Sequence, residues 1–525
     1  MKKSVKNAIL VAIVYGYLAI PFLLFAGGWL QWYLGVAVGI LTAVSLWRCV
    51  RESELDLQWI FEKHNAMTLF VVLALIAFWV WLSGISGLSF QNHDHWLRNN
   101  MYEILVEEQW PVRRYIDGHD RVLVYYMGYW LLPALIGKFF GYQVGWYSIF
   151  VLSVFSIFLV YVLLCAWRKR VEVWPMVVLI LFSGLDLIST NLLKGSATTF
   201  FGVDHIDGWL YDVQLSAMST QLYWVFNQAI PAWVCVMLLM AEGKKRNLLF
   251  PMGCMLISSV LPFVGLVPIA AYLLLKDSGS DLNKGLKNWF KKHVLPLFSF
   301  QNLVGVFVVG LITVIYISCN MVAGNNLSSA SENLATQVAK AASQPALADA
   351  INGEISEDIV LLVSDSRAIL RYIIFAVTEF GLYAALIWKR QKKNPLYYIV
   401  ILSLALIPFI RVAEGIDFSA RASIPALFVL MLYVIDAVDK DFKAKKWLAF
   451  GSLVLVLAIG SSTAIHEIRR SMVYSIAMDD FRFKYMEPTI DTNMILWGSN
   501  FSGYGNDKFF FEKMVRPTEV TQVFT

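Results

Sequence analysis

Asp94 stands between His93 and His95, directly after a strongly apolar stretch of the chain. The pattern over 94–110 predicts an amphipathic helix with Asp94 at its start. At that position a carboxylate can cap free backbone N–H groups, or it can act as a general base that takes a proton from an acceptor hydroxyl. Adjacent side chains of an extended segment point to opposite sides, so a metal site made of His93, Asp94 and His95 together is geometrically poor.

A second polar segment, 191–224, carries His205 and Asp207 two positions apart. Two interpretations remain open for this pair: it shares one site with Asp94, or its members are solvated loop residues. Gln228 lies at the mouth of the apolar segment that follows. A polar side chain at such a position lines a cavity more readily than it faces lipid.

Arginines recur near the segments that we expect on the same side of the membrane. Arg411 and Arg421 enclose a short turn that contains Asp417, and a helix is predicted to begin within it. Arginines and helix amino termini both favour phosphate. The alternative is an ion pair between Asp417 and Arg421 that only shapes the turn. Two further arginines are candidates for the pocket: Arg371 lies inside an apolar segment, and Arg98 lies on the polar face of the helix predicted over 94–110.

The composition places these residues in a membrane protein. The chain has 525 residues, of which 58% are hydrophobic, and its mean hydropathy is +0.61. Apolar windows long enough to cross a bilayer, about 18 residues or more, recur along it. We therefore predict an all-α polytopic membrane protein. Thirteen spans are expected, at about 7–26, 28–47, 67–88, 145–166, 172–190, 225–241, 247–261, 262–276, 303–321, 367–388, 395–412, 422–438 and 446–463.

Two apolar stretches need a different interpretation. Spans 247–261 and 262–276 are short and contain proline and glycine, so they form either two full crossings or a re-entrant hairpin covered by protein. Residues 125–141 are predicted to be an interfacial or re-entrant helix, because their aromatic side chains favour the headgroup level.

Basic residues set the expected orientation. More than half of the 43 Lys and Arg fall in short segments that lie on one side if the amino terminus is cytoplasmic. This excess predicts that orientation. Residues 1–66 then hold two helices and a linker, residues 67–463 form the core, and 464–525 are an extracytoplasmic tail. The outer segments are 89–144, 191–224, 322–366 and 413–421.

Several functions are disfavoured by the same sequence. Five scattered cysteines form no CxxC pair, so no disulfide or thiol site is predicted. No basic face remains outside the inner segments, which argues against a nucleic-acid partner. Arg469 and Arg470 are interpreted as ordinary surface charge. The segment 322–366, rich in small and polar residues, is either an unstructured loop or a lid over substrate.

The chain resembles the GT-C superfamily of membrane glycosyltransferases, whose members include protein mannosyltransferases and oligosaccharyltransferases. Members of this superfamily share one plan: an acidic residue stands just after a span, and a large outer loop with interfacial helices follows it. Here two spans precede that loop instead of one, and the interfacial helix has a single proline. The segments that carry the likeness are 92–98, 109–112, 125–138, 219–233 and 417–425.

The resemblance implies a sugar transfer from a polyprenyl-phosphate donor to an envelope glycan, lipid or protein, at the outer face of a bacterial inner membrane. It implies Asp94 as the catalytic carboxylate and Arg421, Arg411 or Arg371 as ligands of the lipid phosphate. A divalent metal is compatible with the family, but no clear motif here indicates one. The alternatives are a flippase or transporter of lipid-linked saccharides and a non-catalytic subunit of an envelope assembly. Few mid-span charges and no internal repeat argue against transport.

Overall fold

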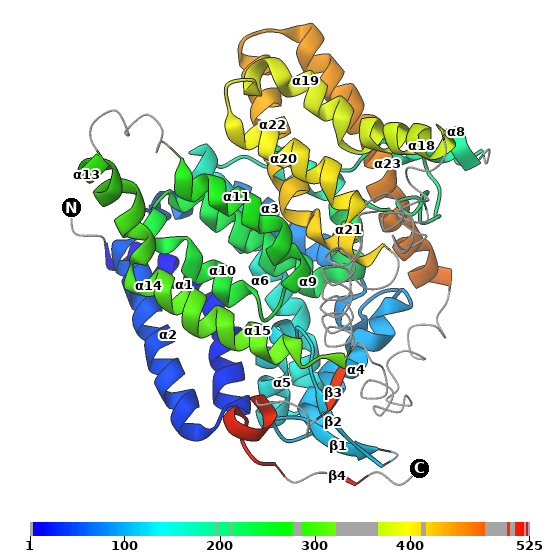
Figure 1. Ribbon diagram of the computed structural model, residues 1–525. Coiled ribbons are helices and arrows are strands. Elements are labelled where there is room, and N and C mark those ends of the chain that lie inside the picture. Colours follow the sequence, from blue (N-terminus) through cyan, green and yellow to red (C-terminus); the bar gives the residue numbers. More distant parts are fainter. Residues whose placement is uncertain are drawn as a thin grey trace, which may run out of the picture.

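The computed structural model describes residues 4–116, 118–194, 197–210, 213–276, 286–321, 366–410, 416–477, 501–504, 510–518 and 521–522. Residues 322–365, most of one predicted outer loop, lie outside these ranges, as does Arg411. Helices dominate the described chain, and Figure 1 shows them gathered in a bundle with a small sheet at one end. The predicted helical class is confirmed.

Helices α1 (Val5–Trp29) and α2 (Trp32–Glu52) form an antiparallel pair. Both are almost entirely apolar, as helices surrounded by hydrocarbon must be. Asn7 fixes the start of α1, because its side chain donates to the carbonyl of Leu55 at 2.8 Å and accepts from the N–H of Leu57 at 2.7 Å. Together, α1 and α2 bring the chain back to the end of the bundle at which α1 starts.

Helix α3 (Ala66–Leu82) leads into the first polar segment through a tight turn. Gly84 has φ +81°, and a Cβ there would collide with the carbonyl of Phe90, so this turn requires glycine. Gln91 closes it by donating to the carbonyl of Gly84 at 2.7 Å. The turn leads directly into α4 (Asp94–Glu107), which agrees with the helix predicted over 94–110.

A four-stranded sheet follows α4, and the sequence analysis did not predict it. Strands β1 (Arg113–Ile116) and β2 (His119–Leu123) pair as an antiparallel hairpin. β3 (Ser502–Tyr504) adds antiparallel to β2, and β4 (Thr521–Gln522) adds parallel to β1. The hairpin thus has its outer partners almost four hundred residues away, and the molecule is not purely α-helical.

Helix α5 (Gly128–Phe140) coincides with the predicted interfacial helix. Its 13 residues are too few to cross a bilayer. Gly128 begins it by donating to the carbonyl of Ile257, which lies beyond α10 (Leu249–Met255). α10 has only seven residues, which is also too short for a crossing, so the region 247–276 is not a pair of full spans.

Helix α9 (Met218–Glu242) occupies the centre of the bundle. Its Trp233 is completely buried and stacks between Trp79 of α3, at 6.0 Å, and Phe428 of α22 (Ile424–Lys443), at 6.2 Å. The indole N–H donates to Gln221 at 3.0 Å. Packing of this kind holds one end of α9 in register with both neighbours.

The remaining helices surround this core (Figure 1). Several are interrupted by short 3-10 or π turns, which lets the chain bend within an apolar segment. They are α6 (Tyr142–Arg168), α7 (Trp174–Leu181), α8 (Asp186–Lys194), α11 (Val260–Leu275), α13 (Leu286–Trp289), α14 (Phe300–Val304), α15 (Leu311–Ser318), α18 (Ser366–Ala376), α19 (Leu382–Gln391), α20 (Pro395–Leu406), α21 (Asp417–Ala422) and α23 (Trp447–Ala477).

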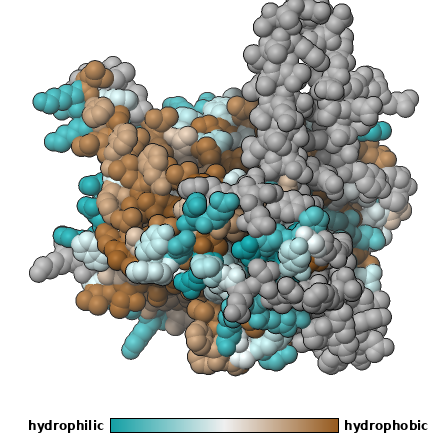
Figure 2. Space-filling model, turned by 60° about the horizontal axis from the view of Figure 1, so that its bottom comes forward, coloured by the Kyte–Doolittle hydropathy of each residue, from teal (hydrophilic) through white to brown (hydrophobic). Residues whose placement is uncertain are grey.

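Within the described chain, nine helical segments are long and apolar enough to cross a membrane. Figure 2 shows the broad hydrophobic surface that they form. The chain is therefore a polytopic helical membrane protein, while the number thirteen stays a prediction. The nine segments are Val5–Trp29, Trp32–Glu52, Lys63–Leu82, Tyr142–Arg168, Trp174–Leu193, Met218–Glu242, Phe300–Ser318, Ile369–Gln391 and Trp447–Ile476.

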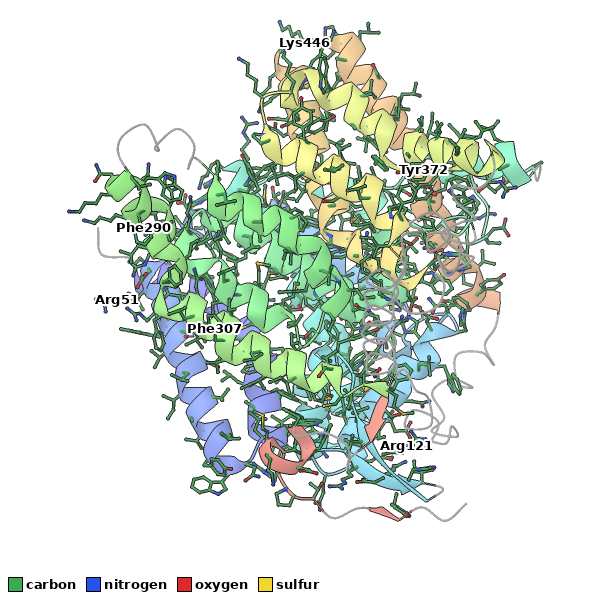
Figure 3. All side chains as sticks on the ribbon, in the orientation of Figure 1. Arg51, Arg121, Phe290, Phe307, Tyr372 and Lys446 are labelled. Carbon is green, nitrogen blue, oxygen red and sulfur yellow. The ribbon has the colours of Figure 1, made fainter. Side chains whose placement is uncertain are left out.

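Basic segments that were predicted to share one membrane side contact the same partner helix. Arg170, just beyond the end of α6, pairs with Asp439 near the end of α22 at 3.1 Å. Arg390, at the end of α19, pairs with Asp441 of the same helix. Figure 3 shows Lys446 far from Arg121, which lies in the sheet. The sheet and this basic group thus lie at different ends of the molecule.

The predicted start of a tail at 464 falls inside a helix. α23 continues to Ala477, because two polar side chains of its last third, Glu467 and Arg470, pair with each other at 2.5 Å instead of ending the span. Farther along, Val515 forms a β-bridge with Leu30, so part of the predicted tail is bound to the bundle.

Candidate functional site

The Asp94 carboxylate contacts the side chains of Arg98 and His93 at the start of α4. Oδ2 accepts from Nη2 of Arg98 at 2.9 Å, and Oδ1 lies 3.2 Å from Nε2 of His93. The side chain is 30% exposed, so solvent or a ligand reaches it. Asn92 accepts from the N–H of Asp94 at 3.1 Å and so supplies the cap at this turn. The carboxylate is held in place without serving as the cap.

Arg98, whose side chain is 11% exposed, pairs with Asp94 and has unused hydrogen-bonding capacity. Its guanidinium lies 5.7 Å from the ring centre of Phe226, and its Nη1 has no hydrogen-bond partner among the described residues. Burial lowers the pKa of Arg98, the Asp94 carboxylate opposes that change, and the positive charge of Arg421 adds to it. Arg421 therefore lies within electrostatic reach of Arg98.

Arg421 reaches the same place from α21. Its Nη1 lies 2.5 Å from Oδ1 of Asp417, while its buried Nε has no partner within the described chain. Tyr125 lies near both arginines: burial raises its pKa, and the charges of Arg421 and Arg98 partly oppose that rise. The site therefore combines two buried guanidinium groups with the phenol of Tyr125, beside the partly exposed Asp94.

The position of α21 depends on a close contact with α11. A Cβ at Gly265 would collide with the carbonyl of Ala422, so glycine is required for the two helices to approach this closely. Ser419 of α21 also accepts from the N–H of Gln214 at 3.3 Å. These contacts fix α21, and with it Arg421, against α11 and the segment that contains Gln214.

Trp224 of α9 lies at the centre of an adjoining cluster. The ring of His93 lies 5.3 Å from it and the ring of His205 lies 4.7 Å from it. Its indole N–H donates to Glu467 at 3.3 Å, and the guanidinium of Arg470 lies 5.3 Å from its ring centre. Through Trp224 and His93, His205 lies on the same side of the molecule as Asp94.

His205 and Glu467 form a histidine–carboxylate pair. Nδ1 of His205 lies 2.6 Å from Oε1 of Glu467, and the Glu467 side chain is only 1% exposed. Arg470 pairs with the other oxygen of Glu467 at 2.5 Å. The prediction that Arg470 is ordinary surface charge is wrong, because a buried carboxylate holds it. The signal in the sequence was an acid and a base three positions apart inside an apolar helix.

His95 positions the site and does not line it. Its Nε2 donates to the carbonyl of Tyr223 at 3.1 Å, and Asn92 donates to the same carbonyl at 2.9 Å. That carbonyl is available because α9 is kinked at Val225, where φ is −139°. Burial, with help from the charge of Arg98, lowers the pKa of His95 to about 3. The side chain is neutral and fixes the start of α4 against α9.

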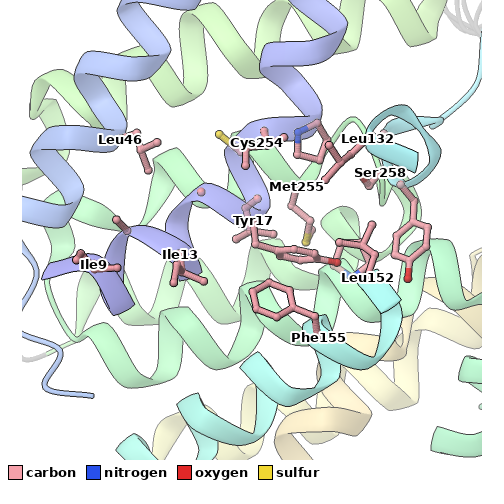
Figure 4. Close-up of a pocket in the computed structure, with 18 residues that line it drawn as sticks. Ile9, Ile13, Tyr17, Leu46, Leu132, Leu152, Phe155, Cys254, Met255 and Ser258 are labelled. Atoms are coloured by element: carbon pink, nitrogen blue, oxygen red, sulfur yellow. The ribbon is translucent and has the colours of Figure 1, made fainter. Parts of the chain in front are cut away.

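An apolar cavity of about 500 Å³ lies within the bundle (Figure 4). Residues of α1, α5 and α6 line it, and two of these, Ile9 and Phe155, are also exposed on the outside of the bundle. Tyr129 lines the cavity, and its ring lies 5.4 Å from that of Phe226. Phe226 also lies 5.7 Å from the guanidinium of Arg98, so it links the cavity wall at Tyr129 to the charged cluster.

The other predicted site residues lie elsewhere. Asp207 is buried and accepts from the N–H of Ala217 at 3.1 Å, and burial, followed by the charge of Asp186, raises its pKa. Gln228 is buried within α9, with its Oε1 unpartnered among the described residues. Arg371 is exposed on α18. Asp207 is thus neither a solvated loop residue nor in contact with Asp94; it faces the buried acids Asp186 and Glu467.

In the described part of the chain, no group of three or more His, Cys, Asp or Glu side chains is arranged to hold a metal ion. His93 contacts Asp94 and Trp224, while His95 points into the protein.

No family model, no curated protein and no solved structure matches this chain.

Proposed function

We propose that the chain is a membrane glycosyltransferase of the GT-C type, which moves a sugar from a polyprenyl phosphate to a hydroxyl acceptor. One observation carries the proposal: Asp94, a partly exposed carboxylate, pairs with Arg98, whose charge is felt by a second arginine, Arg421, and an apolar cavity lies beyond Phe226 and Tyr129. A lipid-linked sugar needs these three features together, because its tail is apolar, its phosphate is anionic and its acceptor must lose a proton.

In this mechanism the acceptor oxygen attacks the anomeric carbon while the bond from that carbon to the phosphate oxygen breaks. Asp94 takes the hydroxyl proton, and polyprenyl phosphate leaves with the bonding electron pair. Direct displacement inverts the anomeric centre. Arg421 and Arg98 neutralise the leaving phosphate, and their unpartnered N–H groups are the donors for it. Arg371 is exposed on another helix, so its predicted role at the phosphate has no support.

The proposal places the reaction at the extracytoplasmic face of a bacterial inner membrane, with an envelope glycan, lipid or protein as acceptor. The positive-inside pattern of the sequence supports that side. The pair of half-buried His205 and buried Glu467 adjoins Asp94 through Trp224 and His93 and would line the acceptor side of the site.

Asp94→Asn tests the base directly. Asparagine keeps the shape of the side chain but cannot accept the hydroxyl proton, so we expect transfer to be lost. Mass spectrometry of envelope glycans from cells that carry only the variant gene measures this, alongside protein level and thermal unfolding in detergent. Glu107→Gln is the matched control, because Glu107 is an exposed carboxylate at the other end of the same helix. Glycans of normal mass and amount in the Asp94→Asn cells would refute the assignment.

The alternative, a transporter of lipid-linked saccharides, is favoured by a separate observation. Asp186 and Glu379 are buried carboxylates in segments apolar enough to cross the membrane, and Asp207 lies with them. Ionisable groups in such positions commonly carry coupling ions. If the chain is a transporter, Asp186→Asn will abolish glycan assembly while Asp94→Asn spares it. The glycosyltransferase proposal predicts that Asp94→Asn removes the transferred sugar and leaves the lipid-linked precursor accumulating.

A further inference from the structure

A second cavity, of about 1430 Å³, opens far from the candidate site. α9 gives the separation: Trp224 belongs to the candidate site, while Glu242, eighteen residues later, ends the helix beside this cavity. At 1.5 Å per residue the two lie about 27 Å apart. Figure 3 shows Arg51, which lines the cavity, at the other end of the molecule from Arg121.

The cavity is strongly cationic. Six basic side chains and two carboxylates line it, which leaves an excess of four positive charges. The carboxylates are already paired, Glu54 with Lys244 at 2.9 Å and Glu52 with Arg246 at 3.4 Å. The six basic residues are Arg51, Lys244, Lys245, Arg246, Lys276 and Lys292.

The walls of the cavity are held by a buried polar network. Glu242 is 3% exposed and accepts from Ser53 at 2.5 Å and from Asn247 at 3.0 Å. Gln301 of α14 donates both to Asn247, at 3.0 Å, and to Glu52, at 3.2 Å. Three segments remote in sequence are thereby fixed around the cations, and a preorganised site loses less entropy when it binds a ligand.

The rim of the cavity is apolar and exposed. Trp47 lines the cavity yet is 56% exposed, and it continues a row of exposed side chains along α2 that includes Ile40 and Val44. Phe290 and Phe298, at 52% and 60% exposure, belong to the short helices after α13, one of which supplies His293 to the lining. A cationic cavity beside lipid-facing apolar surface fits a ligand that carries a phosphate and hydrocarbon together.

We propose that this cavity binds the phosphate group of an anionic membrane lipid, whose acyl chains lie along the exposed row of α2. The excess positive charge attracts the phosphate, and the exposed tryptophan lies at the headgroup level. A soluble phosphate compound would use the same cations but not the apolar rim. This inference does not depend on the proposed sugar transfer, because the two sites lie at different ends of α9.

The test uses the full chain purified in detergent, stripped of lipid and titrated with dioleoyl phosphatidylglycerol. Native mass spectrometry measures the bound lipid, with dioleoyl phosphatidylcholine and inorganic pyrophosphate as the other probes. Arg51→Gln with Lys276→Gln removes two exposed cations. Each basic residue near an anionic headgroup contributes roughly fivefold in affinity, so the double variant should bind phosphatidylglycerol roughly twentyfold more weakly.

Two further variants keep the test decisive. Lys389→Gln with Lys393→Gln removes the same charge from the same predicted membrane side but outside the cavity, and should bind like the wild type. Arg51→Lys with Lys276→Arg keeps the charge and should restore binding. The proposal is overturned if phosphatidylcholine binds equally well, if the cavity variant binds phosphatidylglycerol undiminished, if the control loses as much, or if pyrophosphate binds and phosphatidylglycerol does not.

Discussion

At the scale of single residues, the site depends on the different surroundings of the two terminal nitrogens of Arg98. One of its terminal nitrogens contacts Asp94, and the other is buried without a partner among the described residues. A buried guanidinium N–H that lacks an acceptor is costly, so an anion that supplies one is favoured there. Asp94, 30% exposed, stays within reach of a hydroxyl on its open side. Base and phosphate ligand are thus adjacent but separate groups.

His95 should make stability depend on pH. Its pKa is about 3 in the folded protein, against about 6.5 in an unfolded chain. Between these pH values the unfolded chain binds a proton at His95 more readily than the folded protein does. The stabilising contribution of neutral His95 is therefore complete above about pH 6.5 and is lost as the pH falls toward 3. We expect the unfolding temperature in detergent, followed by tryptophan fluorescence, to drop between pH 7 and pH 5.

Substitution identifies the residue that causes this drop. Glutamine at position 95 keeps a donor for the carbonyl of Tyr223 but does not titrate, so His95→Gln should show a smaller drop. His64→Gln is the control, because the His64 side chain is exposed. Equal pH dependence in the wild type and in His95→Gln would show that other groups cause it.

At the scale of elements, the sequence predicted helices well where they were local. The start of α4, the short helix α5 and most spans follow from apolar runs and from one polar residue at a boundary. The hairpin of β1 and β2 could not be found in this way, because its flanking strands come from the last 24 residues of the chain. Pairing between segments so distant leaves no periodic signal in either one.

The site residues divide along the same line. Asp94 and Arg421 were found because each stands beside an apolar segment and is locally conspicuous. Trp224, Glu467 and Arg470 were missed, because their roles depend on which face of α9 meets which face of α23. By hydropathy, α9 and α23 are both membrane spans, and hydropathy gives no information about which of their faces are in contact.

The contact between α11 and α21 offers a test at this scale. A methyl group at Gly265 would collide with the carbonyl of Ala422 and displace α21, and Arg421 would move with it. We expect Gly265→Ala to slow transfer roughly a hundredfold, since displacements near 1 Å have effects of that size. Gly39→Ala in α2 is the matched control, because a Cβ there meets nothing within 4 Å. Equal glycan transfer by the two variants would show that α21 does not need this contact.

At the scale of the whole molecule, two charged sites occupy opposite ends of one apolar bundle. The end with the sheet carries Asp94 and paired arginines, whereas the cavity near Arg51 is lined by six basic side chains and two carboxylates. Basic side chains such as those near Arg51 are attracted to anionic lipid and are not easily moved across the membrane. They therefore fix the orientation of the protein in the bilayer. Orientation in turn decides which pool of substrates Asp94 can meet.

Cysteine labelling tests that orientation. The five native cysteines are buried, so single cysteines at exposed positions report accessibility. We expect His119→Cys, in the sheet, to react with a membrane-impermeant maleimide on intact spheroplasts, and Lys393→Cys to react only after the membrane is broken. Both positions are exposed in the structure, so a difference between them reflects the bilayer and not burial. The opposite labelling would place Asp94 in the cytoplasm, where a sugar donor need not cross the membrane first.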